Sequence, residues 1–413
     1  MSAKPFDIPK QLVWKAWQQV RANRGSGGVD GESIAEFELH IEDNLYRIWN
    51  LMSSGSYFPP DVRGVEIPKA KGGTRLLGIP TISDRVAQAT VKLQIESRLE
   101  SVFMSDSYGY RPGKSAHDAI AITRTRCWKW KWCLEFDIRA MFDRIPHELV
   151  MKAVKKHIPE KWCELLISRW LQAGIQLPSG ERRERNAGTP QGGVISPLLC
   201  NLFMHYAFDL WMRRSFPDLP WCRYADDGLI HCRSYAQAQH VHEVLSARLR
   251  ECGLELHEGK THVVYTGLNS ALRAAHVTSF DFLGFTFRIR GARSSSKQEV
   301  FDGFLPAVSD SALKKMKHVI KRAWKFRHRS DLKLEQIAEM INPSIRGWFN
   351  YYGKFYNSRL QIIARYLNAH LVKWARCHFR RQHSDRQMLF DWLRKEYCRR
   401  PKLMAHWEYF KVV

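Results

Sequence analysis

Two adjacent carboxylates stand in a short turn between two β-prone segments. The turn is Tyr224-Ala225-Asp226-Asp227, and the flanking apolar runs extend from Trp221 to Tyr224 and from Gly228 to His231. This pattern predicts a β-hairpin whose tip aims at least one carboxylate into a shared pocket, because successive strand side chains point to opposite faces. Such an arrangement suits a metal site. Taken by itself, the turn is equally well explained as a solvated acidic loop.

A third carboxylate lies far upstream, at the end of another predicted strand. Trp132 to Ile138 alternates apolar and polar residues, which favours a strand, and a helical pattern begins at Pro146. Mg²⁺ prefers oxygen ligands and keeps substrate phosphates in its coordination shell. Asp137, Asp226 and Asp227 together therefore suit phosphoryl or nucleotidyl transfer with two ions. We interpret the neighbouring acids Glu135, Asp143 and Asp281 as structural.

An ordered series of motifs surrounds these carboxylates over most of the chain. In order, the motifs are Asn23 to Gly31, Val65 to Lys69, Arg75 to Pro80, Tyr108 to Ser115, Phe136-Asp137, Gly188 to Pro197, the Tyr-Ala-Asp-Asp turn, Gly253 to His257, Phe282 to Phe285 and Ile345 to Tyr352. In this order they resemble a group II intron reverse transcriptase, or maturase. The Ser196-Pro197 ending favours the intron-type branch over diversity-generating enzymes.

The resemblance implies a right-hand polymerase of the α+β class, with fingers, a palm that contains an antiparallel sheet, and a helical thumb. The expected divisions are an N-terminal extension at 1–60, fingers at 61–130, palm at 131–290, thumb or maturase domain at 291–375 and a basic, DNA-binding-like tail at 376–413. No paired C-x-x-C framework follows the thumb. The chain therefore resembles the compact, endonuclease-lacking, bacterial class C-like branch.

The N-terminal sixty residues predict helices on both sides of a glycine-rich loop. Apolar residues recur at helical spacing from Leu12 to Val20 and again from Ile34 to Ile48. The loop from Gly25 to Gly31 is either a connector that needs positive φ angles or a segment that approaches the template backbone. On the second interpretation, Arg24 and Gly25 are candidate template contacts.

From Gly64 to Pro80 the pattern predicts a basic β-hairpin with a glycine turn. By resemblance, Lys69 and Arg75 contact the phosphates of the incoming nucleotide, although an ordinary solvated basic turn explains them too. The resemblance also makes Phe142 a steric gate against a 2′-hydroxyl, with core packing as the alternative. Gln191 is expected to contact the nucleotide. Ile138 is a candidate both as a nucleotide contact and as a metal ligand.

Basic residues follow in two further places. Arg111 and Lys114, in the loop from Tyr108 to Ser115, are candidate template contacts. After a polar loop expected from Arg288 to Glu299, Ser309 or Asp310 can cap a helix whose polar side carries Lys314, Lys317, Lys321 and Arg322. From 311 to 413 the chain has 24 Lys and Arg against 7 Asp and Glu, a net charge of +17. This favours an RNA-binding thumb, whose tryptophans mainly pack helices together.

The whole chain is strongly basic. Its 413 residues carry a formal net charge of +24, with a pI near 9.8. Such a surface attracts polyanions in a salt-dependent way. Binding to a membrane surface is the rival use of this charge, but the sequence has no long basic segment with a purely apolar helix face. No apolar stretch is long enough to span a bilayer, and no signal-peptide core begins the chain. The nine cysteines form no C-x-x-C pair, which argues for reduced thiols and against zinc.

The expected activity is RNA-directed DNA synthesis with two Mg²⁺ ions, or Mn²⁺ in their place. The expected partners are dNTPs, an RNA template, a DNA primer or target, and a group II intron RNA whose splicing and retrohoming the protein promotes. We expect a cytoplasmic, nucleoid-associated protein that binds no membrane and is a monomer or a homodimer. Two alternatives stay open: a host-adopted reverse transcriptase for repair or phage defence, and an RNA-binding splicing factor with a vestigial polymerase site. The roles of His257 and Lys260 also stay open.

Overall fold

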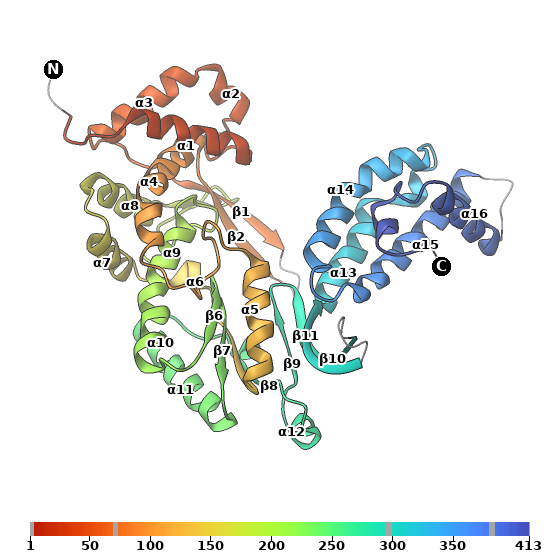
Figure 1. Cartoon of the computed structure of the whole chain (residues 1–413). Helices are drawn as coiled ribbons and strands as arrows, with labels where there is room; N and C mark the ends of the chain where they lie inside the picture. Colours follow the sequence, from red (N-terminus) through yellow and green to blue (C-terminus); the bar gives the residue numbers. More distant parts are fainter. Residues whose placement is uncertain (1–3, 69–72, 294–299, 380–384, 413) are drawn as a thin grey trace. The chain divides into compact units, whose positions relative to one another are not determined.

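The computed structural model describes residues 4–68, 73–293, 300–379 and 385–412 (Figure 1). The chain divides into two compact units. The first contains Met1–Ala119 and Leu134–Val263, and the second contains Ile120–Cys133 and Val264–Val413. In the described segments, no helix is both long and apolar enough to cross a membrane.

The first unit begins with helices, as the apolar spacing predicts. They are α1 (Lys10–Asn23), α2 (Ile34–Leu39) and α3 (Ile41–Ser53). The periodic pattern from Ile34 to Ile48 is divided between two helices because the backbone at His40 leaves the helical region, with φ −122° and ψ 40°. A capping box of Ser33 and Glu36 begins α2. Buried faces of α1 and α3 pack on α4 (Ile82–Glu100).

The predicted basic hairpin is present in a small mixed sheet. Strands β1 (Val62–Pro68) and β2 (Thr74–Ile79) pair antiparallel, and β4 (Ile175–Gln176) and β5 (Arg182–Arg183) complete the order β2-β1-β4-β5. Lys69, a candidate nucleotide contact, lies outside the described residues. Arg75, at the start of β2, is exposed.

A second sheet carries the predicted carboxylates. Its order is β6 (Trp221–Tyr224), β7 (Asp227–Cys232), β3 (Trp132–Asp137) and β8 (His262–Tyr265). β3 lies between two neighbours, so five of its six residues are buried, and only Glu135 is partly exposed. Helices accompany this sheet: α6 (Met141–Arg144), α7 (His147–His157), α8 (Lys161–Gln172), α9 (Ser196–Met204), the π-helix η1 (His205–Asp209), α10 (Leu210–Ser215), α11 (Tyr235–Glu251) and the 3-10 turn η2 (Glu258–Lys260).

The second unit joins a three-stranded sheet to a helical bundle. Strands β11 (Val300–Val308), β10 (Phe285–Arg293) and β9 (Ser279–Phe282) pair in that order. Arg288 to Arg293, predicted as loop, instead continue β10, because their backbones pair with β11. Part of α5 (Ala116–Lys129) belongs to this unit, and Trp128 Nε1 donates to the Phe304 carbonyl at 3.3 Å.

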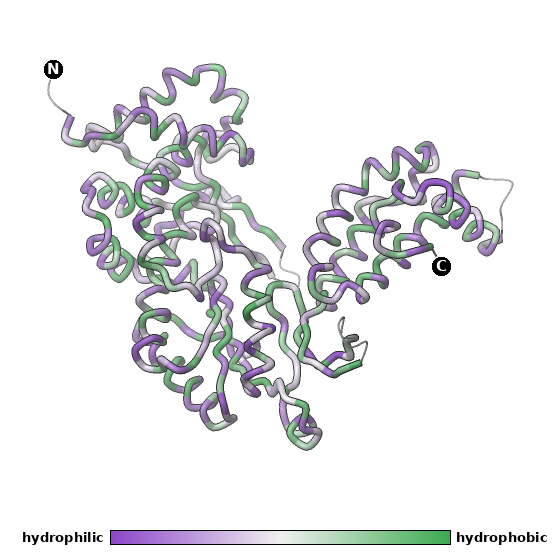
Figure 2. Tube along the Cα trace, in the orientation of Figure 1, coloured by the Kyte–Doolittle hydropathy of each residue, from purple (hydrophilic) through white to green (hydrophobic). Residues whose placement is uncertain are grey.

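The bundle confirms the predicted capped helix. The Ser309 hydroxyl accepts from the Ala312 amide at the start of α13 (Asp310–His318), which continues as the π-helix η3 (Val319–Ala323). The other elements of the bundle are η4 (Phe326–His328), α14 (Leu334–Tyr352), η5 (Asn357–Leu360), α15 (Gln361–His378), α16 (Arg386–Arg399) and η6 (Ala405–Glu408), whereas α12 (Ser270–Ala275) precedes β9. Hydrophobic and hydrophilic residues alternate along these helices (Figure 2). Trp324 and Trp374 lie in the core, as packing residues should.

Candidate active site

The acidic turn is the tip of a tight hairpin. Tyr224 pairs with Asp227, so that Ala225 and Asp226 alone form the loop. Ala225 is left-handed, with φ 57°. A side chain at Gly109 would come within 2.6 Å of the Ala225 amide nitrogen, so glycine is required where the Tyr108–Ser115 loop crosses the turn.

Backbone hydrogen bonds hold this tip against the end of β3. The Ile138 amide donates to the Asp226 carbonyl at 3.2 Å, and the His257 amide donates to the Asp137 carbonyl at 2.8 Å. The side chains of Asp137 and Asp227 lie close enough to share a hydrogen bond when one of them is protonated. The structure therefore brings together the three carboxylates, although about ninety residues of chain separate Asp137 from the turn.

Burial and mutual repulsion make this carboxylate cluster electrostatically unfavourable without a cation. Burial, and then the charge of Asp137, raises the pKa of Asp226. Burial raises the pKa of Asp227 further, together with the charge of Asp226 and the hydrogen bond to Asp137. Lys260 supplies one positive charge, with Nζ 2.6 Å from Asp137 Oδ2.

The donor chemistry of the cluster fits a divalent cation, because hard oxygen ligands with uncompensated charge are what Mg²⁺ binds. Among the residues that the structure describes, however, no group of three or more His, Cys, Asp or Glu side chains is already arranged around a metal position. Asp137 is turned to Lys260 instead. Sequence reasoning left Lys260 without a role, and its pairing with Asp137 could not be read from residues 123 positions apart.

A cavity of about 820 Å³ opens beside the carboxylates. Its walls include four of the predicted nucleotide contacts, Arg75, Ile138, Phe142 and Gln191, together with Asp137 and Asp226. Tyr110, which the sequence did not single out for a role, also lines the cavity, and its ring meets the Phe142 ring edge-on with centroids 6.5 Å apart. Phe142 thus faces the cavity rather than a closed core.

Asp143, which we interpreted as structural, lines the same cavity and holds another of its side chains. Both of its carboxylate oxygens accept from Gln191 Nε2 at 3.2 Å. Because a carboxylate only accepts hydrogen bonds, the Gln191 amide must present its nitrogen to Asp143, which leaves the amide oxygen free. Asp281 remains structural, since it accepts from Thr286 at 2.5 Å on neighbouring strands.

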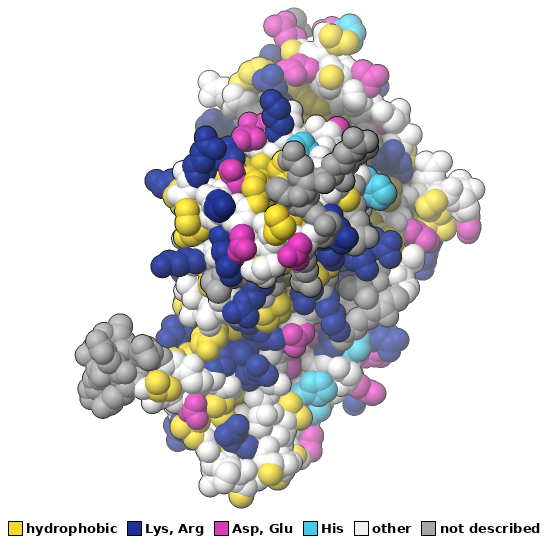
Figure 3. Space-filling view, turned by 90° about the vertical axis from the view of Figure 1, so that its right-hand side faces the viewer, with side chains coloured by type: hydrophobic (Ala, Val, Ile, Leu, Met, Phe, Trp, Pro, Cys, Tyr) yellow, Lys and Arg dark blue, Asp and Glu magenta, His cyan; other side chains and the backbone are white. Residues whose placement is uncertain are grey.

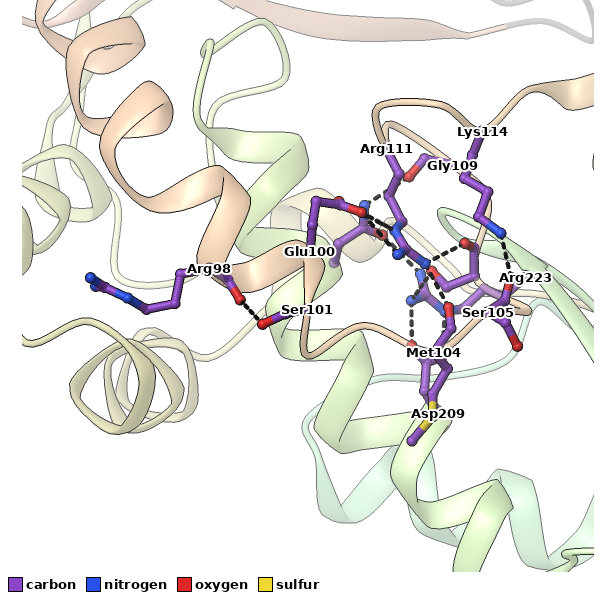
Figure 4. Close-up of polar contacts among 12 residues, drawn as sticks. Arg98, Glu100, Ser101, Met104, Ser105, Gly109, Arg111, Lys114, Asp209 and Arg223 are labelled. Carbon is purple, nitrogen blue, oxygen red and sulfur yellow. Dashed lines mark hydrogen bonds and ion pairs between the residues drawn. The ribbon is translucent and has the colours of Figure 1, made fainter. Parts of the chain in front are cut away.

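Arg111 differs from its predicted role as an open template contact, because its guanidinium is buried and bonded within the loop (Figure 4). It forms an ion pair with Glu100 at 2.9 Å and donates to the carbonyls of Met104 at 2.5 Å and Ser107 at 2.8 Å. These contacts use four of its five N–H groups and stabilise the loop, which argues against the predicted template contact. Lys114 is half-exposed, and its Nζ donates to the Ser105 carbonyl at 3.0 Å.

The remaining candidate RNA contacts are at the surface. Arg24 is exposed, and Gly25 has φ +120° and lies against Arg85, which supports the connector interpretation of this loop. Template contact by Arg24 and Gly25 stays a prediction. In the second unit, Lys314, Lys321 and Arg322 are exposed, and Lys317 Nζ lies 5.6 Å from the centre of the Tyr366 ring. Figure 3 shows Lys and Arg side chains spread widely over one face of the molecule.

Residues 67–287, more than half of the chain, match the family model for "Reverse transcriptase (RNA-dependent DNA polymerase)". The chain belongs to the reverse transcriptase family. Residues 313–392 match the "Group II intron, maturase-specific domain". These matches confirm the predicted family, its RNA-directed DNA polymerase class and its right-hand polymerase fold. Divalent metal ions and nucleic acid are general requirements of this family.

Individual relatives agree with the family match. Protein YkfC of Escherichia coli K12 is 31% identical over 277 residues, which are 57% of this chain and 71% of YkfC. The group II intron-encoded protein LtrA of Lactococcus lactis is 32% identical over 197 residues, covering 47% of this chain. The alignment spans only 32% of LtrA. Among solved structures, telomerase from Candida albicans, with a fragment of telomeric RNA, aligns with a TM-score of 0.47 and 12% identity over 92% of this chain and 69% of that chain.

Proposed function

We propose that this protein synthesises DNA on an RNA template by two-metal nucleotidyl transfer. The observation that carries the proposal is the meeting of Asp137, Asp226 and Asp227 beside a cavity that also contains Arg75, Phe142 and Gln191. A vestigial polymerase site would have no reason to keep one buried and two partly buried carboxylates together at a cost in free energy.

The three aspartates would hold the metal ions, with the backbone at Ile138 beside them. Two bound Mg²⁺ ions, or Mn²⁺, would supply activation of the primer 3′-hydroxyl and neutralisation of the triphosphate. Arg75, with Lys69 of the same hairpin, would bind the triphosphate oxygens. Phe142 would pack under the sugar, and Gln191, held by Asp143, would contact the same nucleotide. Catalysis of this kind depends on positioning and charge stabilisation.

Primer extension tests this proposal. The purified protein, a DNA primer annealed to RNA, Mg²⁺ and dNTPs should give extended DNA, and omission of the template strand beyond the primer should give none. If the protein extends no primer with either Mg²⁺ or Mn²⁺ but still binds intron RNA, the splicing-factor alternative is correct.

Replacing Phe142 by alanine should weaken the preference for deoxynucleotides. Without the ring, a 2′-hydroxyl no longer meets a steric barrier, so we expect the dNTP over rNTP preference in kcat/KM to fall by about 10–100-fold. Single-nucleotide incorporation measures both substrates. Phe58→Ala is the control, because Phe58 is 71% exposed and lies against Arg169 outside the cavity. An unchanged preference in Phe142→Ala would show that the ring only packs.

We also propose that the protein binds a group II intron RNA to promote splicing and retrohoming. The maturase-specific match and the net charge of +17 from 311 to 413 support this role. Cytoplasmic, nucleoid-associated localisation follows from it, because the template, the primer or target DNA and the intron RNA are all found there in bacteria. RNA domains of a group II intron that flank the gene would distinguish this role from that of a host-adopted enzyme.

Four thumb residues should account for part of the salt dependence of RNA binding. The logarithm of the RNA-binding constant falls linearly with the logarithm of the salt concentration, and each basic side chain that neutralises a phosphate adds roughly 0.7–0.9 to the steepness of that fall. Changing four such side chains to glutamine should therefore make the slope less steep by about 3. The substituted residues are Lys314, Lys317, Lys321 and Arg322. Filter binding to intron RNA over a range of KCl concentrations measures the slope. A matched variant with glutamine at four exposed lysines elsewhere should change it little; these are Lys15, Lys129, Lys152 and Lys161. Equal effects would place the RNA elsewhere.

A further inference from the structure

A fully buried arginine immediately precedes the catalytic turn, three residues before Asp226. Arg223, on β6, has no solvent exposure, and neither does its ion-pair partner Asp209. Figure 4 labels Arg223 and Asp209. The guanidinium makes five hydrogen bonds: Nε to Asp209 Oδ1 at 2.8 Å, Nη2 to Asp209 Oδ2 at 2.8 Å, Nη2 to Ser107 Oγ at 2.8 Å, Nη1 to Asn201 Oδ1 at 3.0 Å and Nη1 to the Ala225 carbonyl at 3.2 Å. Every N–H of the guanidinium is therefore directed to an acceptor.

Stability alone does not explain this ion pair. Removing two charges from water is expensive, and apolar residues of similar volume serve as well or better. Burial raises the pKa of Asp209, and the charge of Arg223 opposes that shift. The planar guanidinium fixes the orientation of the two side chains, because it makes two parallel hydrogen bonds to one carboxylate. A pair of apolar side chains would not do so.

The Arg223 guanidinium also contacts the turn that carries the carboxylates. Its Nη1 holds the carbonyl of Ala225, the residue whose φ of 57° an alanine adopts only when its surroundings impose it. Asn201, which accepts from the same Nη1, donates its own amide to the Gly109 carbonyl at 2.7 Å. Gly109 in turn lies against the Ala225 backbone. One side-chain network thus reaches the turn directly and through the glycine packed against it.

The anchor of this network is an irregular segment of helix. Asp209 is the last residue of the π-helix η1, which interrupts the helical run from α9 to α10. A π-helical turn changes the direction of the side chains that follow it, and such turns are frequent at functional sites. Here the inserted turn ends at the carboxylate that meets Arg223.

We propose that the Arg223–Asp209 pair is a positioning device that sets where the turn presents Asp226 and Asp227 to Asp137. Arg223 and Asp209 are positioning residues, because neither lines the cavity beside the carboxylates. The inference rests on the proposed polymerase function. The path is short, since the Asp226 carbonyl, next to the carbonyl that Arg223 holds, accepts from Ile138 beside Asp137. A loosened pair changes the rate of the chemical step and the binding of metal, and leaves the nucleotide contacts of Arg75 and Gln191 in place.

The test compares Arg223→Lys and Asp209→Asn with the wild type. Lysine keeps the charge and loses the fork, and asparagine keeps one acceptor oxygen and loses the charge. For both variants we expect kcat in primer extension to fall by about 10–100-fold, with the KM for dNTP nearly unchanged. Mn²⁺ binding, followed by electron paramagnetic resonance in the absence of nucleotide, should weaken in parallel, which a merely structural role would not require.

Glu160→Gln is the matched control. Glu160 forms a similar two-point pair with Arg98, at 2.7 and 3.0 Å, between α4 and the start of α8, away from the turn. All proteins are assayed below their unfolding midpoints. If Arg223→Lys and Asp209→Asn keep kcat and Mn²⁺ affinity within twofold of this control, the proposal is wrong.

A milder variant keeps the test decisive if those two fail to fold. Ser107→Ala removes one of the five hydrogen bonds and leaves the ion pair intact. We expect a smaller but measurable loss of kcat with unchanged KM, and wild-type kcat would overturn the proposal. A wild-type protein that extends no primer would refute the proposed function instead, while the Mn²⁺ comparison would still test the positioning role.

Discussion

Replacing Asp226 by alanine is expected to abolish primer extension while RNA binding persists. Asp226 lies at the hairpin tip, where its burial and the nearby Asp137 already disfavour an uncompensated charge. Removing a proposed ligand of the metal pair should cost several kcal/mol of transition-state stabilisation, and each 1.36 kcal/mol corresponds to a factor of about ten in rate. We therefore expect kcat/KM to fall by roughly a thousandfold or more, measured by single-nucleotide incorporation on an RNA template.

The control for this variant is Asp218→Ala, which removes the same charge from an exposed position outside the cavity. Filter binding to intron RNA should give wild-type affinity for both variants, because the basic residues from 311 to 413 are untouched. Appreciable extension by Asp226→Ala would remove the carboxylate cluster from the mechanism. Loss of RNA binding in the same variant would show that the turn serves a structural purpose.

The positions of the three carboxylates on their strands could be predicted because the signals for them are local. An apolar strand, a two-residue turn and a second apolar strand define a hairpin within about twelve residues, and strand alternation places Asp137 at a strand end. That the two segments meet is not local information. We grouped the three carboxylates on the chemistry of Mg²⁺ ligands and then on the resemblance, and the structure supplies the backbone bond from Ile138 to Asp226 that joins the two segments.

Charged side chains were predicted less well because their partners decide their roles. Arg111 is in a motif rich in glycine and basic residues, and the sequence does not show that Glu100 and two carbonyls use four of its five N–H groups. Lys260 meets Asp137 over 123 positions, and Arg223 meets Asp209 across a π-helical turn that no periodicity predicts. Likewise, the polarity of Arg288 to Arg293 led us to expect a loop. These residues form a strand instead, because their backbones pair with β11, and the sequence of one segment does not show such pairing.

Removing the carboxylate of Asp209 should be among the most destabilising single changes in the first unit. Asp209→Ala leaves the Arg223 guanidinium buried without a counter-ion, a defect that typically costs about 3–5 kcal/mol. We expect the urea midpoint of this unit to fall accordingly. Glu160→Ala breaks a partly exposed pair, in which the Arg98 side chain is 42% exposed, and should cost no more than about 1 kcal/mol.

A double substitution separates stability from positioning. Asp209→Leu combined with Arg223→Met replaces the ion pair by apolar groups of similar size, which usually restores or exceeds the original stability. Since no guanidinium then holds the Ala225 carbonyl, we expect the urea midpoint to return while kcat stays low. If the double variant recovers both stability and kcat, the pair only fills the core. If it recovers stability alone, the ion pair is retained because it directs the turn that carries Asp226 and Asp227 to Asp137.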